Sequence, residues 1–205
     1  MSITRRGLLL GSLALLAGCS TNGRNDGANY AARPDETHPM PAMKLDKIKA
    51  EFRRTEVAYE TRHKPGTVVV DTPSRRLYYV LGGGRAIRYA ISVGREGREL
   101  RGNAYVGRKA EWPSWTPTAN MIRRDPEKNL KYAGGVPGGL NNPLGARAIY
   151  LYRGGRDTNF RIHGTNQPSS IGYAMSSGCI RMLNHDVIDL YARVSSGTQV
   201  VVNQG

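Results

Sequence analysis

The stretch VVVDTPSRRLYYVLGGGRAIRYAISV, residues 68–93, decides the fold class. It opens with a β-branched run at 68–70, and a second apolar run, 77–80, leads to three consecutive glycines. Beyond the glycines, apolar residues alternate with other residues over 87–93, which is the period of a strand with one buried face. Glycine readily adopts the positive φ angles of tight hairpin turns. The pattern therefore predicts a β-hairpin that turns at 82–84.

The rest of the sequence adds further strands and a few helices. The helical spacing of Val187, Ile188 and Tyr191 predicts a late helix, and Asn184 is expected to cap it. One strand is expected to start at 105–106 and run toward 112, and others are expected at 148–152, 160–163 and 199–202. The expected helices are 117–129 and 185–194, and the expected loop is 133–145. Many short strands with glycine turns are typical of a mostly-β sandwich or barrel. We therefore expect such a fold over 67–202, with one or two short helices.

Residues 1–19, MSITRRGLLLGSLALLAGC, are an expected export signal. Arg5 and Arg6 precede an apolar run, 7–18, which is shorter than the roughly 20 residues that a membrane-spanning helix needs. The arginine pair is similar to a twin-arginine signal, although a general secretory signal also begins with basic residues. Either route leads to the periplasm.

The last residues of this segment, LAGC, resemble the bacterial lipoprotein signal, in which Cys19 would be lipidated. The alternative is a small-residue cleavage site that happens to end near a cysteine. Ser20 follows the cysteine, which is similar to the outer-membrane sorting pattern. We expect a periplasmic protein that is anchored to the outer membrane through this lipid.

Residues 20–66 are expected to connect the signal to the folded domain. Over 20–43 hydrophobic periodicity is absent and Asn, Gly, Pro and Asp recur, which indicates a flexible tether. The segment 44–66 mixes helical and alternating spacing, so it is expected to be a short helix or an extended lead-in that packs on the domain.

Charge narrows the class of partner. The sequence has 30 Lys and Arg against 16 Asp and Glu, a formal net charge of +14, which predicts attraction to an anionic polymer or surface. The basic residues are scattered, without the clustering typical of nucleic-acid binding. With an export signal, nucleic acid leaves the set of expected partners, and cell-wall peptide with free carboxylates becomes the expected polyanion.

The chemistry concentrates around Cys179 and His163. If Cys19 is lipidated, Cys179 is a lone thiol in an oxidising compartment, which marks it as reactive. A thiol attacks carbonyls as thiolate and needs a base, and His163 lies sixteen residues before it. Gly178 permits a sharp turn that can aim its own N–H and that of Cys179 at one oxyanion. The carbonyl of Gly164 can orient the imidazole. Arg181 suits a substrate carboxylate.

Other interpretations fit these residues taken singly. A lone cysteine is often a small buried hydrophobe, and a lone histidine at a strand end is often structural. A zinc site fits poorly, because His38, His63 and His185 lack the spacing of zinc ligands. We expect neither a metal nor a cofactor.

The run HGTNQPSSIGYAMSSGCIRM, residues 163–182, closely resembles the catalytic signature of bacterial L,D-transpeptidases (YkuD-type domains). That signature is His-Gly, a spacer, then Ser/Thr-x-Gly-Cys followed by an apolar residue and Arg or Asn. The stretches VVVDTPSRRLYYV, KAEWPSWTPT and GGLNNPLGARAIYLY resemble Gram-negative members of the family, and the resemblance covers about 67–202. Ser177 departs from it, since many members have histidine there. This places a second-histidine function in doubt but not the Cys–His pair.

The resemblance implies a cysteine acyl transfer on peptidoglycan stem peptides. Cys179 would attack the carbonyl that joins a diamino acid to the terminal D-Ala, and His163 would accept the thiol proton and pass one to the departing D-Ala. An amine of a second stem would then resolve the thioester. Arg181, with Ser177 beside the nucleophile, would bind substrate or brace the loop, and Trp112 and Trp115 are candidates for the cleft wall.

Two further functions are consistent with the same residues. A peptidase or amidase would pass the acyl group to water, and a non-catalytic lipoprotein would bind the cell wall through its basic surface. The acceptor also stays open among a stem peptide, a lysine of an outer-membrane lipoprotein, a free D-amino acid and water.

Overall fold

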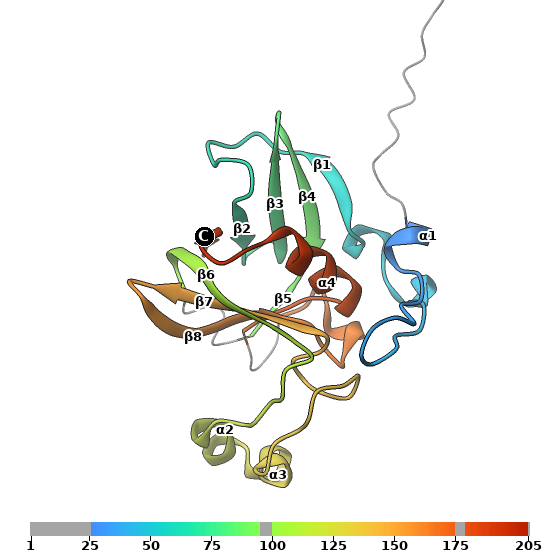
Figure 1. Ribbon diagram of the computed structural model, residues 1–205, viewed down its shortest axis with the longest axis vertical. Coiled ribbons are helices and arrows are strands. Elements are labelled where there is room, and N and C mark those ends of the chain that lie inside the picture. The colour runs from blue at the N-terminus through green and yellow to red at the C-terminus, as the bar shows by residue number, and fades with distance from the viewer. Residues whose placement is uncertain (1–25, 95–99, 175–178, 205) are drawn as a thin grey trace, which may run out of the picture.

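The computed structural model describes residues 26–94, 100–174 and 179–204, and its core is one ten-stranded mixed sheet (Figure 1). The strands follow the order β1-β4-β3-β2-β10-β6-β7-β8-β9-β5. Their bounds are β1 Thr55–Ala58, β2 Val68–Asp71, β3 Arg76–Gly82, β4 Arg85–Ala90, β5 Ser92–Val93, β6 Gly102–Glu111, β7 Arg147–Arg153, β8 Arg156–His163, β9 Ile180–Arg181 and β10 Gln199–Asn203. The prediction of a mostly-β fold with few short helices is confirmed.

The predicted hairpin joins β3 to β4. Gly82 pairs with Arg85, so Gly83 and Gly84 form a two-residue turn with φ angles of 58° and 69°. Two positive φ angles in succession are the geometry of the turn that matches the twist of hairpin strands. The prediction of a turn at 82–84 is therefore confirmed.

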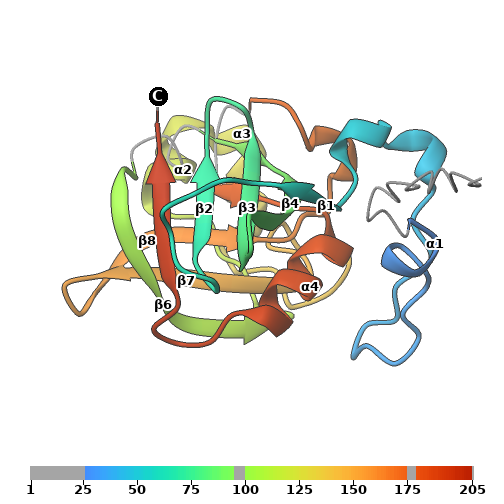
Figure 2. The same ribbon diagram turned by 90° about the horizontal axis from the view of Figure 1, so that it is seen from above.

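The sheet bends so that its two halves enclose one core. Strand β10 joins the halves by pairing in parallel with β2 and antiparallel with β6 (Figure 2). Leu77 and Tyr89 from one half and Leu151 and Ile162 from the other share a single buried apolar cluster with Leu190 of helix α4 (Asn184–Arg193). Alternation of buried residues along the strands thus places the polar face of β8 on the outside of this core.

The helices are short, as expected. They are α1 Asp26–Asn29, α2 Ala119–Arg124, α3 Pro126–Asn129 and α4, with 3-10 turns η1 Leu45–Lys47, η2 Ala50–Phe52, η4 Leu130–Tyr132 and η5 Pro168–Ser170. Helices α2 and α3 fall within the predicted helical segment 117–129. In the described ranges, no helix is both long enough and apolar enough to cross a membrane.

Residues 26–58, here called the N-terminal arm, pack against the domain. Tyr30 is only 2% exposed and Met40 only 4%. The arm meets α4, where the His185 ring nitrogen Nε2 lies 2.9 Å from the Ala31 carbonyl. This corrects the expectation of a flexible tether for residues 26–43. The buried residues of the arm are too far apart along the chain to produce a hydrophobic period, so the sequence pattern concealed them.

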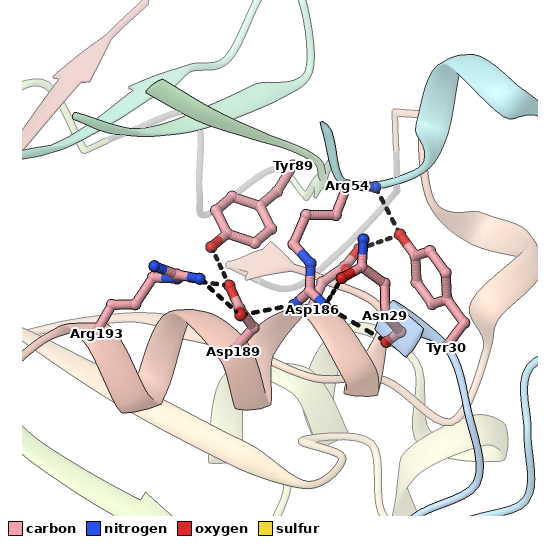
Figure 3. Close-up of polar contacts among 7 residues, drawn as sticks. All are labelled: Asn29, Tyr30, Arg54, Tyr89, Asp186, Asp189 and Arg193. Carbon is pink, nitrogen blue, oxygen red and sulfur yellow. Dashed lines mark hydrogen bonds and ion pairs between the residues drawn. The ribbon is translucent and has the colours of Figure 1, made fainter. Parts of the chain in front are cut away.

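A buried polar network fastens the arm to α4 (Figure 3). It comprises Asn29, Tyr30, Arg54, Tyr89, Asp186, Asp189 and Arg193. Arg54 forms an ion pair of 3.1 Å with Asp189, and the Tyr30 hydroxyl donates to Asp186 at 3.3 Å. Burial raises the pKa of Asp186 to about 7, against the lowering effect of Arg54. Breaking such a network is costly, because the loss of one partner leaves a buried charge unpaired.

The segment 113–145, here called the 113–145 loop, connects β6 to β7 and carries α2 and α3 away from the sheet (Figure 1). Its two ends meet where the Trp112 N–H donates to the Ala146 carbonyl at 2.8 Å. Glu36 of the arm holds both ends, accepting from Trp112 Nε1 at 2.9 Å and from Arg147 Nη2 at 2.8 Å. Trp112 has a φ of 41°, a strained value for a residue with a side chain.

Candidate active site

Strands β8 and β9 bring His163 and Cys179 to the same part of the sheet. The two strands are parallel, with Ile162 paired to Ile180 and His163 to Arg181. Ile162 and Ile180 face the core, so the alternating residues on either side of them face the other way. Cys179 directly precedes β9, so its backbone lies beside the last residues of β8, the strand that ends at His163.

Cys179 is half-buried and takes no part in a disulfide. Its Sγ lies 3.7 Å from the carbonyl oxygen of Asn159, one of the weak S–H contacts typical of a thiol. Asn159 has a φ of 62°, which lies in the left-handed region. The sulfur is therefore partly accessible and contacts β8 four residues before His163.

His163 is only 5% exposed, and its Nδ1 lies 2.7 Å from the carbonyl oxygen of Gly164. A carbonyl only accepts, so Nδ1 must carry the proton and Nε2 must carry the lone pair. Desolvation by burial lowers the pKa of His163 to about 3, with further lowering from the charges of Arg181 and Arg161. The imidazole is thus neutral, with Nε2 available as a proton acceptor.

Asn184 lies beside this histidine in a role that the sequence did not predict. The N-cap of α4 is Leu183, without a side-chain cap bond, so the expectation that Asn184 caps the helix is wrong. Its Oδ1 instead accepts from the backbone N–H groups of Thr165 and Ala146, each at 3.1 Å. The signal in the sequence that could have indicated this role was a pair of glycines, Gly145 and Gly164. A Cβ at either position would overlap Oδ1 of Asn184.

A cleft of about 500 Å³ lies between the 113–145 loop and the residues that follow His163. Its lining comprises Trp115, Met121, Arg124, Asp125, Lys128, Asn129, Lys131, Tyr132, Val136, Asn141, Pro143, Asn166, Gln167 and Arg181. The basic side chains in this set outnumber the acidic one, so the cleft suits an anionic ligand. Arg181 lines the cleft, is the register partner of His163, and follows Cys179 by two residues.

The two tryptophans that were candidates for the cleft wall separate. Trp115 lines the cleft, whereas Trp112 is 8% exposed and packs with Met40, Ala146 and Ile188. Ser177, Gly178 and Cys19, which the sequence suggested for substrate binding, the oxyanion site and lipidation, lie outside the described residues.

Comparison with known proteins identifies the family. The family model described as the L,D-transpeptidase catalytic domain matches residues 65–202. The Escherichia coli protein described as "Probable L,D-transpeptidase ErfK/SrfK" is 38% identical over 138 residues, which cover 66% of this chain and 43% of that protein. The chain thus aligns with less than half the length of that curated relative.

Solved structures share the fold. A crystal structure from Brucella melitensis, described as a probable carnitine operon oxidoreductase, is 49% identical, covers 78% of this chain and 99% of its own, and has a TM-score of 0.53. A mutant L,D-transpeptidase of Enterococcus faecium is 18% identical, covers 68% of this chain and 50% of its own, and has a TM-score of 0.50. The family match spans most of the chain and includes both His163 and Cys179. The chain therefore belongs to the L,D-transpeptidase catalytic-domain family.

Proposed function

We propose that this protein is a cysteine L,D-transpeptidase that acts on the stem peptides of peptidoglycan, with Cys179 as nucleophile and His163 as base. The observation that carries the proposal is the parallel pairing of β8 with β9. It pairs His163 with Arg181, which follows Cys179 by two residues and lines a basic cleft. The family match supports the reaction class.

In the first step, Nε2 of His163 accepts the thiol proton while Sγ of Cys179 attacks the carbonyl carbon before the terminal D-Ala. The low pKa of His163 disfavours a resting thiolate–imidazolium pair, so proton transfer accompanies the attack. When the tetrahedral intermediate collapses, the C–N bond breaks and the imidazolium returns the proton to the departing D-Ala amine. The products of this step are a thioester on Cys179 and free D-Ala.

In the second step, an acceptor amine attacks the thioester carbonyl. The C–S bond breaks, His163 takes the proton from the amine, and the sulfur is protonated again. We propose that Gly178 and Cys179 donate their N–H groups to the oxyanion in both steps, and that Gly164 orients the imidazole. The last assignment is supported by the 2.7 Å separation of its carbonyl from Nδ1.

The cleft supports a substrate that carries carboxylates. The basic residues that line it are Arg124, Lys128, Lys131 and Arg181. Stem peptides carry free carboxylates, which positive side chains attract. We assign Arg181 to a substrate carboxylate because it lies in both the cleft and the His163 ladder. We propose that Ser177, beside the nucleophile in sequence, contributes to the same binding.

We also propose that residues 1–19 direct export to the periplasm and that lipid on Cys19 anchors the protein in the outer membrane, with the catalytic domain at 67–202. The sequence LAGC followed by Ser20 supports this assignment. Metabolic labelling with a palmitate analogue tests it: label is expected in the wild type and absent in Cys19→Ala. Label retained in Cys19→Ala would contradict it.

The enzymatic proposal is tested by incubating the protein with disaccharide-tetrapeptides and resolving products by mass spectrometry. Cross-linked dimers together with released D-Ala are expected, and Cys179→Ala should yield neither. Uncross-linked tripeptide as the sole product would mean that water resolves the thioester. Intact substrate, with the protein bound to peptidoglycan, would instead support the non-catalytic wall-binding function.

A further inference from the structure

We propose that Asn184 is the positioning residue of the active site and that it holds His163 in its base-competent tautomer through a single peptide group. The inference rests on the proposed function for its kinetic consequence. Its structural part, the choice of ring tautomer, stands independently of which reaction the protein catalyses.

The peptide group that joins Gly164 to Thr165 connects the two side chains. Its N–H donates to Oδ1 of Asn184 at 3.1 Å, and its carbonyl oxygen lies 2.7 Å from Nδ1 of His163. The N–H and C=O of a trans peptide are coplanar and point in opposite directions. Fixing the N–H on one side therefore fixes the direction of the carbonyl on the other. Hydrogen bonds in such a chain also polarise one another.

Asn184 is itself held from a second direction. The same Oδ1 accepts from the N–H of Ala146 at 3.1 Å, just before β7 begins. Ala146 in turn accepts from the Trp112 N–H at the base of the 113–145 loop. One amide oxygen thus joins the start of α4, the start of β7 and the turn after His163.

The surrounding backbone is built to admit this oxygen. A Cβ at Gly145 or at Gly164 would overlap Oδ1 of Asn184. Gly145 also has a φ of 63°, which residues with side chains rarely adopt. A merely structural N-terminal asparagine would serve the N–H groups of its own helix, but here the side chain bonds to the turn after His163 and to the start of β7.

Without this acceptor, the Gly164–Thr165 peptide can rotate and withdraw its carbonyl from Nδ1. The buried imidazole then has no fixed partner and samples the tautomer in which Nε2 carries the proton, which cannot accept one from the thiol. The expected result is a fall in kcat of about 10- to 100-fold, the range seen when a partner that orients a histidine ligand is removed. KM should change little, because Asn184 does not line the cleft.

The test compares Asn184→Ala, which removes the acceptor, with Asn184→Asp, which keeps an oxygen at the same place. Asn103→Ala is the matched control, since that asparagine is exposed on β6. Ring ¹⁵N NMR on the full chain reports the tautomer. The protein has four histidines, and His163→Gln assigns the signal of interest. Steady-state kinetics on a tetrapeptide stem provide kcat and KM.

We expect the Nδ1–H tautomer in the wild type, Asn103→Ala and Asn184→Asp, and a mixture in Asn184→Ala together with the loss of kcat. An unchanged tautomer in Asn184→Ala, or a mixture in Asn184→Asp, would overturn the proposal. If Asn184→Ala does not fold, Asn184→Leu, which is close in size to asparagine and also lacks the acceptor, replaces it in the comparison. Because NMR needs no turnover, an inactive wild type would refute the proposed function while leaving this result readable.

Discussion

Replacing Glu36 by alanine removes the carboxylate that joins the N-terminal arm to both ends of the 113–145 loop. Arg147 would lose contacts of 2.8 and 2.9 Å, and Trp112 Nε1 would lose its acceptor at 2.9 Å. The Arg147 and Glu36 side chains are 8% and 13% exposed, so this is a buried pair. Breaking a buried pair by deleting one partner costs about 3–5 kcal/mol.

The lower end of that range applies here, because Arg147 keeps the Ala146 carbonyl and a contact of 3.6 Å with Glu111. We therefore expect the free energy of unfolding to fall by about 3 kcal/mol. With a urea m-value of about 2 kcal/mol/M, the unfolding midpoint should fall by about 1.5 M. Urea titration followed by tryptophan fluorescence measures this shift.

Glu56→Ala is the matched control. Glu56 pairs with Arg85 at a similar distance, 2.7 Å, but those side chains are 37% and 62% exposed. An exposed pair contributes at most about 1 kcal/mol, so its midpoint should move by no more than about 0.5 M. If Glu36→Ala moved the midpoint as little as Glu56→Ala does, the arm would not be a structural clamp on the loop.

Three further outcomes are expected. Asp186 has a folded pKa of about 7, above the unfolded value of 3.8, so its protonated form stabilises the wild type at low pH and this contribution is lost as pH rises. The free energy of unfolding of Asp186→Asn relative to the wild type should thus increase between pH 4 and 7, by up to about 1.4 kcal/mol per pH unit. Urea titrations at several pH values measure this difference, and a difference that does not change with pH would contradict the expectation. Because the pKa of His163 is about 3, kcat/KM should show no acid limb centred near the ordinary histidine value of 6.5, and such a limb would show that the imidazole is not held neutral. Lys128→Glu should raise KM for a tetrapeptide several-fold at low salt and less at high salt. Lys44→Glu, outside the cleft, should leave KM unchanged, and equal effects of the two variants would show that the cleft does not bind the substrate.

Local signals in the sequence were sufficient for the longer strands and the late helix, but not for β1 and β9. The glycines at 82–84 and the alternation after them specify a hairpin through backbone geometry that depends on adjacent residues alone. The same holds for α4, whose apolar spacing is helical. The placement of the N-terminal arm depends instead on single buried residues such as Tyr30, which contact partners more than 150 positions away. No local pattern encodes those contacts.

The sequence suggests the chemistry of the site but not the residues that support it. A histidine at a strand end and a cysteine after glycine suggest a base and a nucleophile, and the sheet register pairs His163 with Arg181, two residues after that cysteine. Asn184 was assigned to helix capping, because asparagine is common at helix starts and its true partners belong to β7 and the turn after His163. The basic cleft likewise depends on how the 113–145 loop folds over Arg181, which composition does not encode.

The proposed mechanism requires that Cys179 carries the acyl group. Rapid quenching of the protein with a tetrapeptide stem, followed by peptide mapping in a mass spectrometer, tests it directly. A thioester of the stem on Cys179, lacking the terminal D-Ala, is expected in the wild type, with no adduct in Cys179→Ala. Wild-type cross-linking by Cys179→Ala, or acylation at another residue, would contradict it.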